Sequence, residues 1–253
     1  MNCIAGSAIV YEGPSAFDGQ PIVAIVTNII RPSKNDKTGR MAQLYILCAD
    51  LSPIQAIKTG RDSSICGTCG LRGCGGKQRG CYVNVPNAPQ QIYRAYRAGH
   101  YARVAPEDVA LDLRARGKNL RLGAYGDPAA IPEFVLRYLT NIIPGHTGYT
   151  HAWQRFPNLQ PYLMASVDSA AEASAAQALG WRTFRTRADE QPIGAREIAC
   201  PASAEAGKLT DCDHCRLCNG TTTNDRRANI TIVVHGNPVV VVHALKFVRN
   251  IAA

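Results

Sequence analysis

The sequence predicts an α/β fold in which parallel strands form a full or partial βα barrel. From residue 42 onward, about six short runs rich in β-branched and aromatic residues alternate with segments of helical pattern. This alternation is typical of parallel βαβ units, in which each helix carries the chain to the next strand. Polar and cysteine residues follow several of these runs, as expected where barrel strands end and functional loops begin.

We divide the chain into an N-terminal extension (1–41), a barrel core (42–199) and a C-terminal region (200–253). The extension is irregular except for an apolar run at 21–30, which predicts a buried strand. The C-terminal region holds a cysteine cluster and a closing strand at 230–235. The strands predicted in the core lie at 42–49, 120–125, 147–153, 162–168, 181–187 and 196–200.

Helices are predicted between these strands. Ser52-Pro53 is a helix-start signal after the first core strand. The segment 106–116 begins with Pro, carries acids in its first turn and Arg in its last, and is stopped by Gly117. Further helical patterns lie at 89–101, 129–143 and 169–180.

Composition places the protein in a reducing, aqueous compartment. Hydrophobic residues make up 46% of the 253 residues, and no apolar run is long enough to span a membrane. The residues after Met1 lack the charged start and apolar run of a signal peptide, so we expect a cytoplasmic protein. Thiols stay reduced there, and clustered cysteines are then interpreted as metal ligands instead of disulfides.

The formal net charge is +9. Such a charge favours a polyanionic partner, either nucleic acid (DNA) or a nucleotide. Metal-bound thiolates would cancel part of it.

Eight of the ten cysteines form two sets. The first set lies in a glycine-rich loop (66–81) with the spacing C-x2-C-x4-C-x6-C, which has too little apolar content to build a core or a regular helix. The second set has the spacing C-x11-C-x2-C-x2-C. Cys3 and Cys48 fit neither set. The predicted metal ligands are Cys66, Cys69, Cys74 and Cys81 in the first set and Cys200, Cys212, Cys215 and Cys218 in the second.

These spacings favour one or two [4Fe-4S] clusters, with zinc as the alternative. Pairs of the form C-x2-C also occur in structural zinc sites, but a compact C-x2-C-x2-C run is more typical of cluster ligation. Four thiolates saturate a cubane, whereas three leave one iron open to a substrate or cofactor. In the first set, either Cys74 or Cys81 is then the spare thiol.

Three polar residues that follow predicted strands are candidate catalytic groups: Asp127, His151 and Asp168. They belong to the same expected rim as the first cysteine loop, because functional side chains of such barrels follow the carboxyl ends of the strands. Asp127 lies in a Gly126-Asp127-Pro128 turn between a strand and a helix.

Long segments of the chain resemble a family of cysteine-rich bacteriophage proteins of uncharacterised function. They include ICGTCGLRG, CYVNVPNAP, LRLGAYGDPAAIP, TGYTHAW, LMASVDS, EIACPAS and CRLCNG, within about residues 37–236. This resemblance implies a phage origin, and hence the host cell cytoplasm as the location.

A more distant resemblance is to radical SAM enzymes, which bind a [4Fe-4S] cluster on a three-cysteine loop after the first barrel strand. It implies that S-adenosylmethionine (SAM) contacts Gly126 and Asp127 after the next strand. It also implies that SAM contacts Ser166 and Asp168 at the end of a later strand, and that Arg185 binds the carboxylate of SAM. It also implies an auxiliary cluster on the second cysteine set and an electron-donor partner. The loop has C-x2-C-x4-C where those enzymes usually have C-x3-C-x2-C, although one branch, the thiamin pyrimidine synthases, shares the spacing found here.

Three functions are therefore predicted. The first is an iron–sulfur, radical SAM-like isomerase or transferase that modifies a nucleotide or a DNA base. The second is a zinc- or cluster-stabilised nucleic-acid-binding protein without catalysis. The third is a base-exchange or glycosylase-like barrel in which Asp127 or Asp168 acts as acid–base or nucleophile beside a structural zinc.

Overall fold

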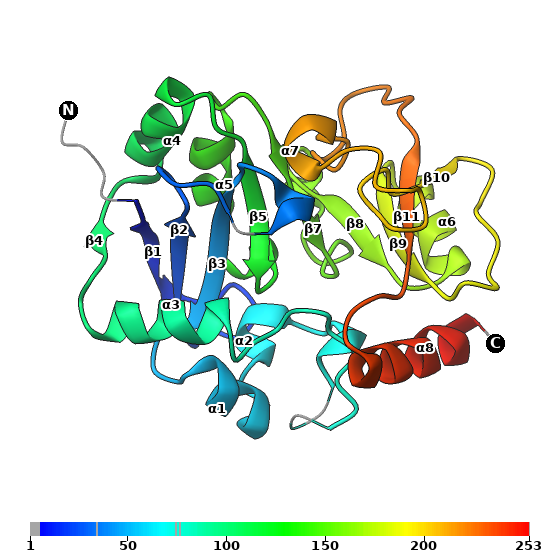
Figure 1. Ribbon diagram of the computed structural model, residues 1–253, viewed down its shortest axis with the longest axis horizontal. Helices are drawn as coiled ribbons and strands as arrows, with labels where there is room; N and C mark the ends of the chain where they lie inside the picture. Colours follow the sequence, from blue (N-terminus) through cyan, green and yellow to red (C-terminus); the bar gives the residue numbers. More distant parts are fainter. Residues whose placement is uncertain (1–5, 34, 74, 76, 253) are drawn as a thin grey trace.

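Two open β-sheets lie side by side in the computed structural model, which describes the chain except residues 1–5, 34, 74, 76 and 253 (Figure 1). One is a mixed sheet of six strands in the order β4-β1-β2-β3-β5-β6, and the other is a parallel sheet of five strands in the order β10-β11-β9-β8-β7. The strands are β1 (Ala8–Pro14), β2 (Pro21–Thr27), β3 (Ala42–Cys48), β4 (Ala102–Arg103), β5 (Leu120–Tyr125), β6 (His146–Thr147), β7 (Tyr149–Thr150), β8 (Met164–Val167), β9 (Thr183–Arg187), β10 (Glu197–Ala199) and β11 (Asn229–Val233). The predicted α/β class is confirmed.

The two sheets meet at Gly148, the single residue between β6 and β7. β6 pairs with β5 and β7 pairs with β8, so the chain leaves one sheet and enters the other at this point. A Cβ at Gly148 would lie 2.7 Å from Leu163 Cδ2 and 2.9 Å from the Leu122 Cβ, so the close packing requires glycine here. Every strand pair from β3 through β5, β8, β9 and β11 to β10 is parallel, but the described strands form no closed barrel.

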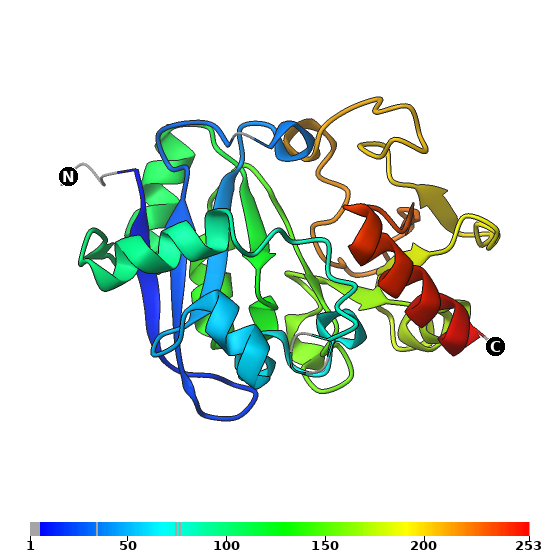
Figure 2. The ribbon, with the colours of Figure 1, turned by 60° about the horizontal axis from the view of Figure 1, so that its bottom comes forward.

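Helices flank both sheets. In the six-stranded sheet, α3 crosses one face of β1–β3, and α4 and α5 pack together on the opposite side (Figures 1 and 2). α6 packs on β8 and β9 of the other sheet. The helices are α1 (Pro53–Thr59), α2 (Ser63–Cys66), α3 (Ala88–Arg97), α4 (Pro106–Ala115), α5 (Glu133–Thr140), α6 (Ala170–Ala178), α7 (Cys212–Cys215) and α8 (Pro238–Ala252).

Local signals explain several helix boundaries. Ser52 forms a capping box with Gln55 at the start of α1, as the Ser-Pro signal predicts. Pro132 divides the helix predicted at 129–143, leaving the 3-10 turn η3 (Pro128–Ala130) and a shorter α5. The first cysteine loop is more regular than expected, because α2 ends at its first residue, Cys66, and the 3-10 turn η2 (Gly70–Arg72) lies within it.

Several elements were not predicted, and two of them, β1 and α8, are substantial. β1 lies in a segment expected to be irregular, and it pairs antiparallel with β2, which pairs in turn with β3. The residues assigned to an N-terminal extension thus contribute two strands to the first sheet. α8 forms from a valine-rich run whose composition favours a strand. It begins at Pro238, where the Asn237 side chain accepts a hydrogen bond from the Val240 N–H, and it buries Ala244 and Val248.

The core of the first sheet is almost fully excluded from solvent. Ile22, Ile25, Leu44 and Ile46 of β2 and β3 are completely buried, which matches the continuous apolar runs of strands covered on both faces. In the described part of the chain, no helix is both long enough and apolar enough to cross a membrane.

Candidate functional site: a cavity between two cysteine groups

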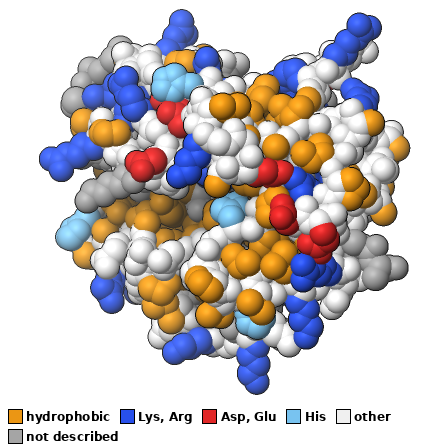
Figure 3. Space-filling model, turned by 45° about the vertical axis from the view of Figure 1, so that its right-hand side comes forward, with side chains coloured by type: hydrophobic (Ala, Val, Ile, Leu, Met, Phe, Trp, Pro, Cys, Tyr) orange, Lys and Arg blue, Asp and Glu red, His pale blue; other side chains and the backbone are white. Residues whose placement is uncertain are grey.

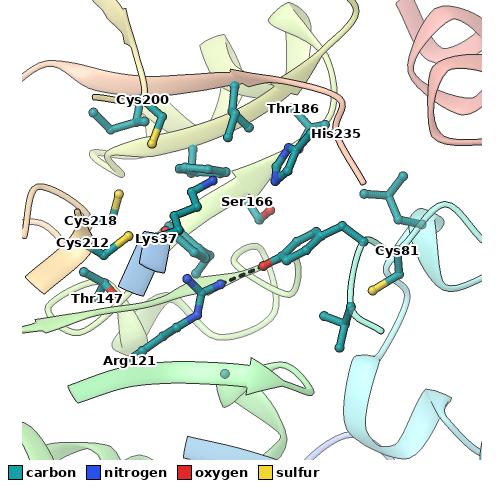
Figure 4. A pocket seen from close by; sticks show the side chains of 18 of the residues that line it. Lys37, Cys81, Arg121, Thr147, Ser166, Thr186, Cys200, Cys212, Cys218 and His235 are labelled. Carbon is teal, nitrogen blue, oxygen red and sulfur yellow. Dashed lines mark hydrogen bonds between the residues drawn. The ribbon is translucent and has the colours of Figure 1, made fainter. Parts of the chain in front are cut away.

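A cavity of about 400 Å³ lies against the inner faces of the parallel strands (Figure 4). Successive residues of a strand point to opposite faces, so alternate residues line the cavity: Arg121 and Tyr125 on β5, and Phe184 and Thr186 on β9. Ser166 of β8 completes this wall. A cavity of this volume lies in the range that holds a small organic molecule.

Seven cysteines line the cavity in two groups. The first cysteine group comprises Cys66, Cys69 and Cys81, and the second comprises Cys200, Cys212, Cys215 and Cys218. Cys74 lies outside the described residues. All seven are free thiols, and Cys48, which the spacing assigned to neither set, is buried away from both groups.

The first cysteine group lies at the carboxyl ends of β3 and β5. Cys66 ends α2, and the neighbouring Ile65 carbonyl accepts a hydrogen bond from the Asp127 N–H at 2.6 Å. Gly126 has a φ of +80°, and a Cβ there would lie 2.8 Å from the Ile46 Cβ and 3.3 Å from the Ile65 carbonyl oxygen. Glycine at this turn therefore allows the cysteine loop to approach the end of β5 closely.

Two half-buried cations, Arg72 and Arg79, stabilise the same loop. Arg72 forms an ion pair with Asp62 at 3.1 Å and donates a hydrogen bond to the Gly60 carbonyl at 2.8 Å. Arg79 donates hydrogen bonds to the carbonyls of Cys81 and Val83 at 3.1 and 3.2 Å. The glycine-rich loop thus has internal supports beyond any metal that it binds.

Burial raises the pKa of the Cys66 thiol well above its ordinary value, and the thiols of Cys69 and Cys81 raise it further. Burial likewise raises the pKa of Cys81. At neutral pH these thiols stay protonated when no cation is bound. A metal or cluster would reverse this balance, because a bound cation stabilises thiolates.

His151 lies at the centre of the polar groups beside Cys69. Its Nε2 is 3.8 Å from Cys69 Sγ, 3.2 Å from Ser166 Oγ and 3.5 Å from Asp168 Oδ2. Burial opposes its charge, but Cys69 and Asp168 together raise the pKa of His151 well above its ordinary value. Asp168 Oδ1 is buried and has no hydrogen-bond partner among the described residues. The structure therefore brings Cys69, His151, Ser166 and Asp168 together.

Asp127 also lines this end of the cavity, but its carboxylate already has partners. Oδ1 accepts a hydrogen bond from the Ala129 N–H and Oδ2 accepts one from the His151 N–H, both at 2.9 Å. Burial raises the pKa of Asp127, and these two hydrogen bonds lower it. Asp127 caps the turn after β5 and positions His151. Its predicted contact with the ammonium group of SAM stays a prediction.

Arg185 does not line the cavity. It faces the opposite side of β9 from Phe184 and Thr186, and its guanidinium binds both carboxylate oxygens of Glu197 at 2.8 and 2.6 Å. It also donates to the Pro192 carbonyl at 2.8 Å. Its buried side chain therefore connects β9 to the segment before β10, away from the position expected for a ligand carboxylate.

Three members of the second cysteine group, Cys212, Cys215 and Cys218, lie near the amino ends of β5, β7 and β9, whereas Cys200 directly follows β10. The Asn119 side chain donates to Asp213 Oδ1 at 2.7 Å, and the Gly148 N–H donates to the Cys218 carbonyl at 2.8 Å. Arg182 donates to the Leu217 carbonyl at 2.6 Å. Burial raises the pKa of Cys218 to about 12, so this thiol is also protonated without a bound cation.

The donor set fits a soft metal or an iron–sulfur cluster, because both groups supply sulfur from within one cavity. Among the described residues, no group of three or more Cys, His, Asp or Glu side chains is arranged to hold a single metal ion. A zinc ion needs four ligands within about 2.3 Å of one centre, whereas the thiolates of a cubane bind different irons and lie farther apart.

Several cavity residues were not predicted: Lys37, Tyr82, Arg121 and Thr147. Arg121 and Tyr125 are four residues apart on β5, so their side chains point to the same face of the strand. A polar residue on that face could therefore have been predicted to line the cavity. No sequence pattern indicates the position of Tyr82. Its ring stacks on that of His235, with centroids 5.4 Å apart, and this contact joins segments that are distant in the sequence.

Comparison with known proteins does not identify this fold or site: no family model, no curated protein and no solved structure matches the chain.

Proposed function

We propose that the protein is an iron–sulfur enzyme of the radical SAM type that modifies a nucleotide or a nucleic-acid base. The observation that carries the proposal is the cavity lined by three thiols at the carboxyl ends of parallel strands and by the four thiols of the second cysteine group. Chemistry in βα barrels occurs at the carboxyl ends, where Cys66, Cys69 and Cys81 lie. The open run of parallel strands around this cavity is consistent with a partial barrel.

In this proposal the first cysteine group holds a [4Fe-4S] cluster and the second holds an auxiliary one. Bound to the first cluster, and with one electron supplied by a donor, SAM would provide the radical chemistry that removes a hydrogen atom from the substrate. The protein's own groups bind and orient. Ser166 and Asp168 lie beside His151, whose backbone N–H donates a hydrogen bond to Asp127.

The proposal is tested by anaerobic purification and reconstitution with iron and sulfide. We expect a brown protein whose visible absorption bleaches on reduction, and calorimetric titration should detect SAM binding. An electron donor such as dithionite should then cause SAM cleavage. A colourless protein with stoichiometric zinc and no SAM binding would overturn the proposal.

The net charge of +9 favours a second candidate, a metal-stabilised nucleic-acid-binding protein. On the face shown in Figure 3, however, Lys and Arg side chains are spread around the edge, while hydrophobic side chains surround a hollow. This candidate requires DNA affinity that falls steeply with salt, because phosphate contacts release counterions. A flat salt response would contradict it.

A further inference from the structure

The cavity contains two cations that no described acid neutralises. Arg121, on β5, is 7% exposed, and its guanidinium donates one hydrogen bond, to Tyr82 Oη at 2.7 Å. Lys37, in the 3-10 turn η1 (Asp36–Thr38), points into the same space (Figure 4). Neither side chain forms an ion pair with an acid in the described part of the chain. A buried guanidinium without an anionic partner is energetically costly, so a partner is expected.

Thr147 adds a second, independent observation. Its backbone is paired with that of Arg121 across β5 and β6, and it lines the same cavity. The hydroxyl is buried and has no hydrogen-bond partner among the described residues. Buried polar atoms are almost always hydrogen-bonded, so an unpaired hydroxyl beside an unneutralised arginine indicates a missing ligand group.

Asp127, the acid that lines this cavity among the described residues, does not form an ion pair with either cation. It lies at the end occupied by the first cysteine group, and its oxygens accept hydrogen bonds from backbone N–H groups. The thiols nearest the cations, Cys212 and Cys218, belong to the second cysteine group. A bound cluster would be negative, which makes charge balance by the cations the rival explanation.

We infer that Arg121, Lys37 and Thr147 bind the terminal phosphate of a free mononucleotide whose base extends toward the first cysteine group. This inference rests on the proposed function and selects among its substrates. An arginine with free donor edges matches the geometry of phosphate oxygens, and the lysine adds a point charge.

The remaining cavity walls suit a nucleoside. Tyr149 and Phe184 pack against the second cysteine group, with ring centroids 4.3 Å apart, and offer aromatic faces to the nucleoside close to the cations. The cavity of about 400 Å³ suits one small molecule and not a DNA duplex. A phosphate bound beside the buried side chains of Arg121 and Thr147 is then a terminal one, since a phosphodiester would need chain on both sides.

The test compares the binding of the four deoxynucleoside 5′-monophosphates with that of the matching nucleosides, by calorimetry on the full chain without SAM. We expect one monophosphate to bind at least about tenfold more tightly than its nucleoside, and inorganic phosphate to compete with it. Arg121→Gln should weaken monophosphate binding by about tenfold to a hundredfold and leave nucleoside binding unchanged, since a charge-assisted hydrogen bond is lost. Lys37→Gln and Thr147→Val should act in the same direction with smaller effects.

Controls separate binding from folding and from charge balance. Arg137→Gln changes an exposed arginine on α5 and should leave all affinities unchanged. Arg121→Lys keeps the charge and should retain part of the preference for the monophosphate. If circular dichroism shows that Arg121→Gln does not fold, Thr147→Val tests the same site, because it removes a hydroxyl without changing a charge.

Three outcomes would overturn the inference. Equal wild-type affinity for monophosphates and nucleosides would remove the phosphate site. Single-stranded DNA binding more tightly than any monophosphate would replace a free nucleotide by a nucleic acid. A change of iron content and visible spectrum in Arg121→Gln, with no monophosphate preference in the wild type, would assign the cations to charge balance. Failure of cluster formation or SAM binding, with the phosphate preference intact, would instead overturn only the proposed function.

Discussion

The two cysteine groups occupy opposite ends of one cavity and are supported in different ways. The first lies on a glycine-rich loop that is stabilised from within by Arg72 and Arg79, and it adjoins His151 and Asp168. The second is fixed by hydrogen bonds from the amino ends of the strands. Reactive groups in α/β proteins gather at the carboxyl ends of strands, so the difference supports our proposal that the first group carries the chemistry and that the second has a static role.

The largest effect is expected when each group is removed in turn. Cys66→Ala with Cys69→Ala should abolish SAM cleavage and remove about half the iron, because one of two clusters is lost. Cys212→Ala with Cys215→Ala should also remove about half the iron but preserve the spectrum of the first site. Iron analysis and electron paramagnetic resonance measure both results.

Cys48→Ala is the matched control for these variants, since Cys48 is a buried cysteine outside both groups. It should change neither iron content nor cleavage. Unchanged iron in the Cys212 and Cys215 double variant would mean that the second group binds zinc or no metal. The comparison between a reactive and a static cluster would then be wrong.

Two histidines on the strand path that joins the sheets sharpen the comparison between the ends. Burial lowers the pKa of His146 from 6.5 to about 4, and its Nε2 lies 2.9 Å from the Tyr162 carbonyl oxygen. His146 is at the amino end, whereas His151, with its raised pKa, is at the carboxyl end. The same strand path thus carries a neutral histidine at one end and a charged one at the other.

The sign of the resulting pH dependence follows from proton uptake. Below pH 6.5 the unfolded chain protonates His146 and the folded chain does not, so stability falls as the pH falls toward 4. The full contribution is about 3 kcal/mol in the free energy of unfolding. Urea denaturation at several pH values should show a shallower slope for His146→Gln than for the wild type. The exposed-site control His100→Gln should keep the wild-type slope. If His146→Gln also kept the wild-type slope, the low pKa assigned to His146 would be contradicted.

Asp127 tests the carboxyl end alone. In Asp127→Asn the amide NH₂ replaces an oxygen that accepts a backbone N–H, from either Ala129 or His151. An unsatisfied buried donor costs about 1–3 kcal/mol, so the free energy of unfolding should fall by that amount while iron content stays constant. Asp189→Asn, at an exposed position, is the control.

SAM affinity of the same variant separates two roles for Asp127. A carboxylate that also binds the ammonium group of SAM loses about tenfold to a hundredfold in affinity on this change. Unchanged affinity in calorimetry would limit Asp127 to positioning the turn and His151.

Both cysteine sets and the polar residues at the strand ends could be predicted from the sequence because their signals are local. Cysteine spacing, the turn at Gly126 and the capping box at Ser52 each lie within a few residues. The orientation of Arg185 was not accessible in this way. When a strand is covered on both faces, its sequence does not show which set of alternate residues points into a cavity.

The cation site was missed for a related reason. Arg121 and Lys37 are separated by more than eighty residues and meet only because η1 packs beside α7. The same holds for the division at Gly148, where close packing against Leu122 and Leu163 breaks one predicted strand into β6 and β7. Both features depend on tertiary contacts that no short window of sequence contains.

The smallest expected effect concerns how the second group is held. Asn119→Ala removes the side-chain hydrogen bonds to the Asp213 carbonyl at 3.0 Å and to its carboxylate at 2.7 Å. The net cost should be about 1 kcal/mol, because the freed groups of Asp213 regain water. Since the remaining supports from Gly148 and Arg182 persist, the segment 212–218 should loosen locally without global unfolding.

Hydrogen exchange and alkylation of the metal-free protein should therefore quicken at Cys212 and Cys215 and stay unchanged at Cys66 and Cys69. Asn158→Ala, at an exposed position, should have no effect at either end. Faster reaction at both groups would mean that they are coupled through the cavity, and the two ends could no longer be treated as independently supported.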